Sequence, residues 1–181
     1  IKGLDAIGYT YKYDQLQRLK KMEPYSQIDK LNYAWQTSSS AQLDYQVTLG
    51  YDPNGNIMRL IRRGNDFKIM DNLFYKYNLG TNQLQYVDDL QNDTDFDTDI
   101  DDQSPNNYMY DGLGNLKQDL KSGVIEMRWS VYNKILEVDK SNDESTKFGY
   151  DALQNRVYKE LEDDGDLEEA TYYIRDIQGN I

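Results

Sequence analysis

The sequence predicts an all-β protein built as an array of antiparallel β-hairpin repeats. A short aromatic motif recurs along the whole chain of 181 residues. Tyrosine dominates the aromatic residues, with 17 Tyr against 4 Phe and 2 Trp, and a ring that carries a polar hydroxyl suits a half-buried strand. The aromatic content of 13% is also too high for a simply disordered chain.

The repeated motif reads aromatic, any residue, aromatic, Asp, two further residues, Gly, then Asn or Arg, then an apolar residue. Its best copies are residues 108–116 and 49–57, and copies centre on positions 13, 51, 77, 110, 129, 150 and 175. Repetition of one such unit indicates an array in which each unit packs on its neighbours. The residues that we assign to this structural motif are Tyr11, Tyr13, Asp14, Tyr51, Asp52, Gly55, Tyr75, Tyr77, Tyr108, Tyr110, Asp111, Gly114, Trp129, Tyr150, Asp151, Tyr173, Asp176 and Gly179.

Each copy has the chemistry of a β-hairpin. Tyr108 and Tyr110 are two residues apart, so both lie on one face of a strand. Asp then opens a turn, and Gly55 and Gly114 stand where a type I turn followed by a bulge needs a left-handed backbone. The return strand is expected to restart at an apolar residue, namely Leu19, Ile57, Leu84, Leu116, Ile135, Val157 or Ile181.

Some copies lack the turn glycine, among them the first and the sixth. Gln17 holds that position in the first copy, at a cost of about 1 kcal/mol if its φ stays positive. The sixth copy reads as one residue longer, with Asn155 tolerating the left-handed conformation. We expect relaxed turns in both copies.

Two segments interrupt the repeats. In residues 24–46 the spacing of Ile28, Leu31 and Trp35 permits a short helix, followed by a loop at Ser38–Ser40. About 20 residues cannot bury a core, so this is a helical or loop insertion and not a separate domain. Residues 92–105 form an acidic loop with alternating aspartates. It lacks the central Gly and distal Glu of an EF-hand, which favours a solvated, mobile loop over a calcium site.

Composition excludes several functions. The 32 acidic residues exceed the 20 basic ones, giving a net charge of −12 that argues against binding to nucleic acid or to anionic lipid. No apolar run approaches the length of a membrane span. Without any His or Cys there is no triad, no Cys/His zinc site and no disulfide. No pair of acids is singled out for carboxylate chemistry, so we expect neither an enzyme, nor a cofactor, nor a metal site. Residues 162–169 read as a second acidic hairpin connection.

The motif resembles the Rhs/YD-repeat family, whose hallmark is a Tyr-Asp dipeptide followed by a Gly-Asn or Gly-Arg turn. Residues 51–56 and 110–115 are close to its consensus, and the resemblance covers residues 1–181 as about seven units. Residues 172–180 look like the opening of the Rhs-associated core, so we expect a fragment of a longer protein. Asn78, Ser130 and Arg175 depart from the Tyr-Asp pattern.

The resemblance implies a spiral β-sheet that forms a segment of a hollow β-shell. Bacterial members of the family enclose a variable C-terminal toxin and are often secreted or exposed on the cell surface. The expected function is therefore a non-catalytic structural segment of such a shell, which encapsulates or presents a C-terminal toxin or effector. Its partners are then the remainder of its own polypeptide, with no nucleic acid and no membrane insertion. The alternative is a cell-surface or carbohydrate-binding adhesin repeat, with surface glycans or proteins as partners.

The three most closely spaced copies carry the sharpest structural expectation. Tyr110, Trp129 and Tyr150 should occupy equivalent positions on adjoining hairpins and be largely buried on one face.

Overall fold

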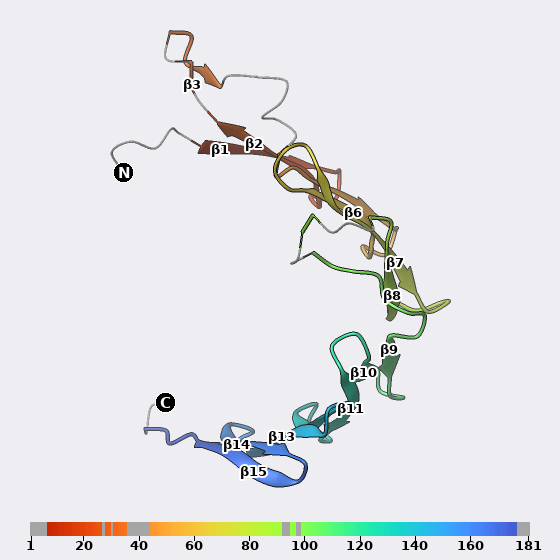
Figure 1. Cartoon of the computed structure of the whole chain (residues 1–181), viewed down its shortest axis with the longest axis vertical. Helices are drawn as coiled ribbons and strands as arrows, with labels where there is room; N and C mark the ends of the chain where they lie inside the picture. The colour runs from red at the N-terminus through yellow and green to blue at the C-terminus, as the bar shows by residue number, and fades with distance from the viewer. Residues whose placement is uncertain are drawn as a thin grey trace. The chain divides into compact units, whose positions relative to one another are not determined.

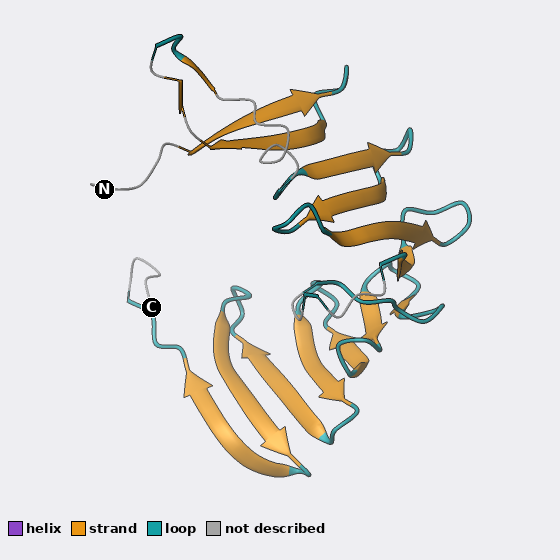
Figure 2. Ribbon diagram, turned by 45° about the horizontal axis from the view of Figure 1, so that its top comes forward, coloured by secondary structure: helices purple, strands orange, loops and turns teal. Residues whose placement is uncertain are grey.

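The computed structural model describes residues 7–26, 28–29, 31–35, 44–91, 95–96 and 99–176. Within these ranges the chain forms strands, turns and loops without a helix (Figure 2). No helix in the described part of the chain could therefore cross a membrane. The chain divides into two compact units, Ile1–Gln103 and Ser104–Ile181, and an antiparallel sheet dominates each of them. The all-β fold class of antiparallel hairpins is confirmed.

The first unit contains a six-stranded sheet with the order β1-β2-β5-β6-β7-β8 (Figure 1). Consecutive strands of each hairpin are neighbours in this sheet, as the repeat predicts. The strands are β1 (Ile7–Tyr13), β2 (Leu19–Ser26), β5 (Val47–Tyr51), β6 (Ile57–Arg63), β7 (Ile69–Tyr77) and β8 (Leu84–Asp89).

The second unit contains a seven-stranded sheet in which β9 to β15 follow one another in chain order. Its last connection is the acidic hairpin expected within residues 162–169, with Asp164 and Gly165 both at positive φ in a two-residue turn. The strands are β9 (Tyr108–Tyr110), β10 (Leu116–Asp119), β11 (Val124–Trp129), β12 (Ile135–Lys140), β13 (Glu144–Tyr150), β14 (Arg156–Asp163) and β15 (Asp166–Tyr172).

The expected helix around Ile28 to Trp35 is wrong. This segment forms a small hairpin of β3 (Ile28–Asp29) and β4 (Ala34–Trp35). Asp29 Oδ1 accepts the N–H groups of Leu31 and Asn32, which favours a turn over a helix. The Trp35 ring packs against Gly8, where an added Cβ would lie 2.3 Å from it. The expected loop at Ser38–Ser40 lies outside the described residues.

Six hairpins share one irregularity in the return strand. Tyr13 pairs with Leu19 whereas Lys12 pairs with Lys21, so Lys20 is an extra residue. Such a bulge bends the strand and increases its twist. The six extra residues are Lys20, Met58, Gln85, Lys117, Leu136 and Val157. Val157 therefore occupies the bulge, and Arg156 is the residue that starts its return strand.

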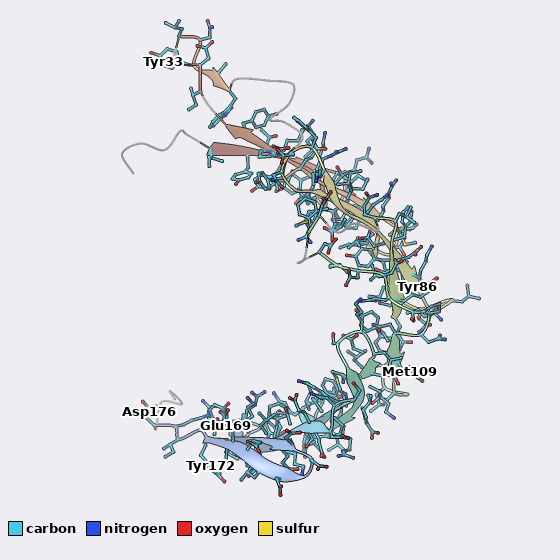
Figure 3. All side chains as sticks on the ribbon, viewed as in Figure 1. Tyr33, Tyr86, Met109, Glu169, Tyr172 and Asp176 are labelled. Atoms are coloured by element: carbon cyan, nitrogen blue, oxygen red, sulfur yellow. The ribbon has the colours of Figure 1, made fainter. Side chains whose placement is uncertain are left out.

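The buried core is small. The buried apolar side chains of the described residues are Pro24, Leu49, Leu73, Val87 and Val124. Side chains project from both faces of the strands in each unit (Figure 3). Tyr110, Trp129 and Tyr150 do occupy equivalent final positions on β9, β11 and β13, but they are half-buried. The expectation that they are largely buried is wrong because a single sheet covers a side chain incompletely.

Residues 92–94 and 97–98 of the acidic segment lie outside the described residues, and several described residues of this segment contact the first unit. Gln103 donates its N–H to the carbonyl of Val87, and its Oε1 accepts the N–H of Val87 at 2.9 Å. Asp102 Oδ1 accepts the N–H of Asp89. The Phe96 ring lies so close to Gly64 that an added Cβ there would be 2.3 Å from it. The hydrogen bonds of Gln103 and Asp102 cover the edge of β8, which would otherwise present unpaired backbone groups.

Candidate functional site

The repeated Asp organises the hairpin tip. In the fourth copy, Asp111 Oδ1 accepts the N–H groups of Leu113 and Asn115, each at 2.9 Å, and Oδ2 accepts Nδ2 of Asn115 at 3.0 Å. Asp151 and Asn155 repeat this arrangement. The Gly-Asn or Gly-Arg signature thus supplies a second side chain that clamps the same carboxylate.

The tip is a closed turn of constant geometry. The Asp N–H donates to the carbonyl four residues later, and the N–H three residues later donates back to the Asp carbonyl. This pattern holds for the tips that begin at Asp14, Asp52, Asp111, Ser130 and Asp151. The third copy has the longer turn, because Asn78 donates to Gln83, five residues on.

The left-handed position is retained whichever residue occupies it. Gly55 and Gly114 have φ values of +93° and +89° as predicted, while Gln17 and Gln154 adopt +60° and +65°. Asn133 holds the same position in the fifth copy at +57°, so the turns without glycine are not relaxed. The sixth copy has the ordinary length, with Gln154 and not Asn155 in the left-handed conformation. Residues other than glycine enter this region at a cost, and the Asp hydrogen bonds help to offset it.

The same hydrogen bonds change the acidity of the turn carboxylates. The pKa lies below the ordinary 3.8 for Asp14, Asp52, Asp111 and Asp151. At Asp111 the main cause is the Asn115 side chain, followed by the Asn115 N–H. At Asp52 burial is the largest single influence and raises the pKa, but the hydrogen bonds led by Asn56 together outweigh it. The carboxylate form is thus the one that the folded tip holds.

In four copies the aromatic residue that precedes the turn reaches back to the preceding hairpin. Its polar hydrogen is donated to the carbonyl of the residue that starts the preceding return strand. The printed pairs are Tyr51 to Leu19 at 2.8 Å, Tyr77 to Ile57 at 2.8 Å, Trp129 to Leu116 at 2.7 Å and Tyr150 to Ile135 at 2.9 Å. We call this interaction the tip clamp. It adds a hydrogen bond between hairpins just where the bulge disturbs the strand pairing.

Arg175 explains one departure from the motif. It stands where the other copies have the aromatic residue, and its Nη2 donates to the carbonyl of Arg156 at 3.4 Å. Arg156 starts the preceding return strand, so the arginine forms the equivalent of the tip clamp. In the same copy the N–H of Tyr173 donates to the carbonyl of Val157 at 2.9 Å. Gly179 lies outside the described residues, and Asp176 is the last residue described.

Neighbouring tips also touch directly. Arg18 Nη1 donates to the carbonyl of Asp52 at 2.9 Å, and its guanidinium lies over the ring of Tyr51. Nδ2 of Asn56 donates to Oδ1 of Asn82 at 2.8 Å. The other motif tyrosines contribute to strand faces: Tyr11 and Tyr13 are exposed on β1, whereas Tyr75 and Tyr108 are half-buried on β7 and β9.

Three buried polar residues were missed by the motif. Asp71 is fully buried, forms an ion pair with Arg62 and accepts the N–H of Ile100 at 3.0 Å. Asp89 is 5% exposed and lies nearby, and its pKa is raised chiefly by burial and further by the charges of Asp71 and Asp99. The polar pair 71–72 inside an otherwise apolar strand was the available signal for Asp71.

The third of these residues, Asn107, closes the β10–β11 connection. Its Nδ2 donates to Oδ1 of Asp119 at 2.8 Å, and its Oδ1 accepts the N–H of Lys121 at 2.6 Å. Across the described residues, acidic side chains do not gather in a group of three or more suited to a metal ion. The motif side chains are thus engaged in holding turns and neighbouring hairpins.

Comparison with known proteins gives structural likeness only. No family model matches the chain, and no curated protein matches it. The chain is similar to a chain of the Tc holotoxin pore of Photorhabdus luminescens, with 14% identity, a TM-score of 0.47 and 97% of this chain covered. It is also similar to chains in crystal structures of TcdB2-TccC3-TEV, at 12% identity, TM-score 0.45 and 95% coverage, and of TcdB2-TccC3-Cdc42, at 13%, 0.46 and 97%.

The chain spans about 7% of the length of each of these three matched chains.

Proposed function

We propose that this chain is a non-catalytic structural segment of an Rhs/YD-repeat shell that encapsulates or presents a C-terminal toxin or effector of the same polypeptide. The observation that supports the proposal is the tip clamp, in which one hairpin after another donates to the carbonyl of its predecessor. Such a contact extends an array in one direction, as a wall requires, and each added unit provides the acceptor for the next.

The chemistry of the tips agrees with this role. Asp111 and Asp151 use their oxygens to accept hydrogen bonds within their own turns. Tyr150 uses its hydroxyl to hold the neighbouring hairpin. Groups so engaged serve structure, and their repetition along the chain is unlike a single catalytic centre. A shell that protects a toxin also fits a secreted or surface-exposed protein.

The test is electron microscopy and limited proteolysis of the full polypeptide that contains this chain. We expect a closed β-shell and a C-terminal segment that resists protease until the shell unfolds. Replacing Trp129 and Tyr150 together by Phe should speed cleavage of that segment, whereas Tyr132→Phe at an exposed turn should not. An open sheet with a fully digestible C-terminal segment would refute the shell role. A catalytic activity that depends on Asp111 or Asp151 would refute the non-catalytic one.

A second candidate function is carbohydrate binding by an adhesin repeat. The observation in its favour is an open groove of about 610 Å³ in the first unit, whose lining includes Tyr75, Tyr86, Asn54 and Gln85. Aromatic faces beside amide side chains are suited to sugars. Binding of neutral glycans that is lost in Tyr86→Ala, but retained in Tyr45→Ala, would favour this function. A blank glycan array would count against it.

A further inference from the structure

A groove near the end of the second unit concentrates positive charge. It measures about 370 Å³ and is lined by Lys134, Tyr150, Gln154, Asn155, Arg156, Tyr173 and Arg175. Three of these residues are cationic and none is acidic. The chain as a whole has a net charge of −12, so the sign of this groove is opposite to that of the molecule.

Two comparable grooves elsewhere in the chain are lined by equal numbers of acidic and basic residues. The groove of the first unit includes Asp52 and Lys76 as its charged lining residues. A further groove in the second unit includes Asp111 and Glu126 together with Lys117 and Arg128. All three grooves lie beside hairpin tips. Of these three, only the groove lined by Arg156 and Arg175 has more basic than acidic lining residues. The repeat therefore provides the shape, and local substitutions provide the charge.

The two guanidinium groups are positioned by contacts within the sheet. The Arg156 guanidinium lies 4.5 Å from the centroid of the Phe148 ring, over its face. Arg175 is tethered through the Arg156 carbonyl by the equivalent of the tip clamp. Ordering a long side chain in advance reduces the entropy that ligand binding would cost.

One acid close enough to interact with Arg175, Asp151, already accepts three hydrogen bonds within its own turn. Arg175 is among the influences that lower the pKa of Asp151, after the hydrogen bonds from Asn155 and Leu153. Asp151 Oδ1 accepts the N–H groups of Leu153 and Asn155, and Oδ2 accepts Asn155 Nδ2 at 3.1 Å. Asp176 follows Arg175 in the chain (both ends of the segment from Tyr172 to Asp176 are labelled in Figure 3) but does not line the groove.

We propose that this groove binds an oxyanion. The ligand is either free sulfate or phosphate, or a sulfate, phosphate or carboxylate group carried by an acidic saccharide. Arg156 and Arg175 supply N–H donors, for which guanidinium groups are suited in oxyanion recognition. Lys134 adds a third charge, and the ring of Tyr173 offers a surface for the sugar in the second case. This proposal does not depend on the shell role.

The probes are sodium sulfate and a sulfated heparin disaccharide, titrated into the full 181-residue chain at low ionic strength and followed by NMR shifts. We expect saturable binding that weakens with added NaCl, because screening reduces the attraction. Replacing Lys134 and Arg156 by Gln should weaken binding by about tenfold or more, since each charged hydrogen bond contributes on that scale. The matched control replaces Lys117 and Arg128 by Gln in the balanced groove and removes the same charge.

The outcomes separate the sources of the anion. Disaccharide binding at least tenfold tighter than sulfate binding assigns the groove to an acidic saccharide, and equal affinities assign it to the free ion. Absence of saturation, or equal weakening by the Lys117/Arg128 control, would overturn the proposal by showing only general charge attraction. Among single substitutions, Arg156→Gln should weaken binding, whereas Arg156→Lys, which retains the charge at the groove, should keep most of it. Loss of binding with both substitutions in a folded chain would mean that the guanidinium itself is required.

Discussion

Aspartate is used in two different surroundings within this molecule. At the hairpin tip, Asp111 accepts its hydrogen bonds from residues two and four positions ahead, and its pKa is lowered by them. At the edge of β8, Asp89 is covered by a segment that lies 13 residues further along the chain, and burial raises its pKa. In a turn, N–H groups a few residues away in the sequence can donate hydrogen bonds to the carboxylate. Where a distant segment of the chain covers the carboxylate instead, the group is buried and other acidic side chains come close to it.

The largest expected effect concerns Asp71, the fully buried acid on β7. Asp71→Ala leaves the Arg62 guanidinium without its partner and the Ile100 N–H without its acceptor. We expect a loss of about 2–3 kcal/mol in unfolding free energy, below the figure for a fully buried pair because Arg62 is partly exposed. Urea denaturation measures it, with Asp166→Ala on an exposed strand as the control. A loss no larger than that of the control would show that the covering segment contributes nothing.

The second effect tests the tip. Gly114→Val should cost about 1–2 kcal/mol or more, because a β-branched residue resists the φ of +89°. Gly114→Asn should be much milder. Gly112→Val is the matched control in the same turn, since Gly112 has open space and no positive φ. Equal melting temperatures for the Gly114→Val and Gly112→Val variants would contradict the assigned turn geometry.

The third effect isolates the tip clamp. Tyr150→Phe removes the hydroxyl that donates to Ile135 while retaining the ring, and we expect a loss of about 1 kcal/mol. Tyr13→Phe changes the same motif position on β1, which is an end strand of its sheet, and should cost less. Thermal unfolding of the two variants compares them directly. Similar small losses would mean that the clamp does not connect hairpins energetically.

The smallest expected effects concern how stability depends on pH, and Asp111 and Asp89 are expected to change it in opposite directions. Because the folded-state pKa of Asp111 lies below 3.8, its carboxylate stabilises the neutral-pH fold, and this contribution disappears as pH falls below about 4. Because the pKa of Asp89 is raised above 3.8, its contribution is present at low pH and is lost as pH rises through that raised pKa.

Substitution by Asn should reveal these signs. Asp111→Asn should lower the melting temperature at pH 7, and the difference should shrink as pH falls through the lowered pKa of Asp111, where the native carboxyl group becomes protonated. Asp89→Asn should raise the melting temperature at pH 7 and change it little at pH 3. The tip at Ser130, whose hydroxyl accepts the N–H groups of Tyr132 and Lys134, does not titrate and serves as an internal reference. The same direction for both aspartates at pH 7 would contradict the comparison.

The hairpin tips were predictable because their determinants are local. Asp, the left-handed residue and the following Asn or Arg lie within five residues, so the turn at Asp111–Asn115 is encoded where it forms. The sixth copy was misread since the apolar residue Val157 was taken as the start of the strand. The bulge moves that start to Arg156, and a bulge depends on pairing with the other strand.

The sequence alone determined the all-β class, the order of the hairpins and the left-handed glycines, because repetition and turn chemistry are local properties. Tertiary structure decided the remainder. It turned the segment around Trp35 into a hairpin that packs on Gly8 and docked Gln103 on the edge of β8. It also selected the Leu19, Ile57, Leu116 and Ile135 carbonyls as acceptors of the tip clamp. The physical reason is that these contacts join residues far apart in the chain, so burial and hydrogen bonding there depend on which strands become neighbours.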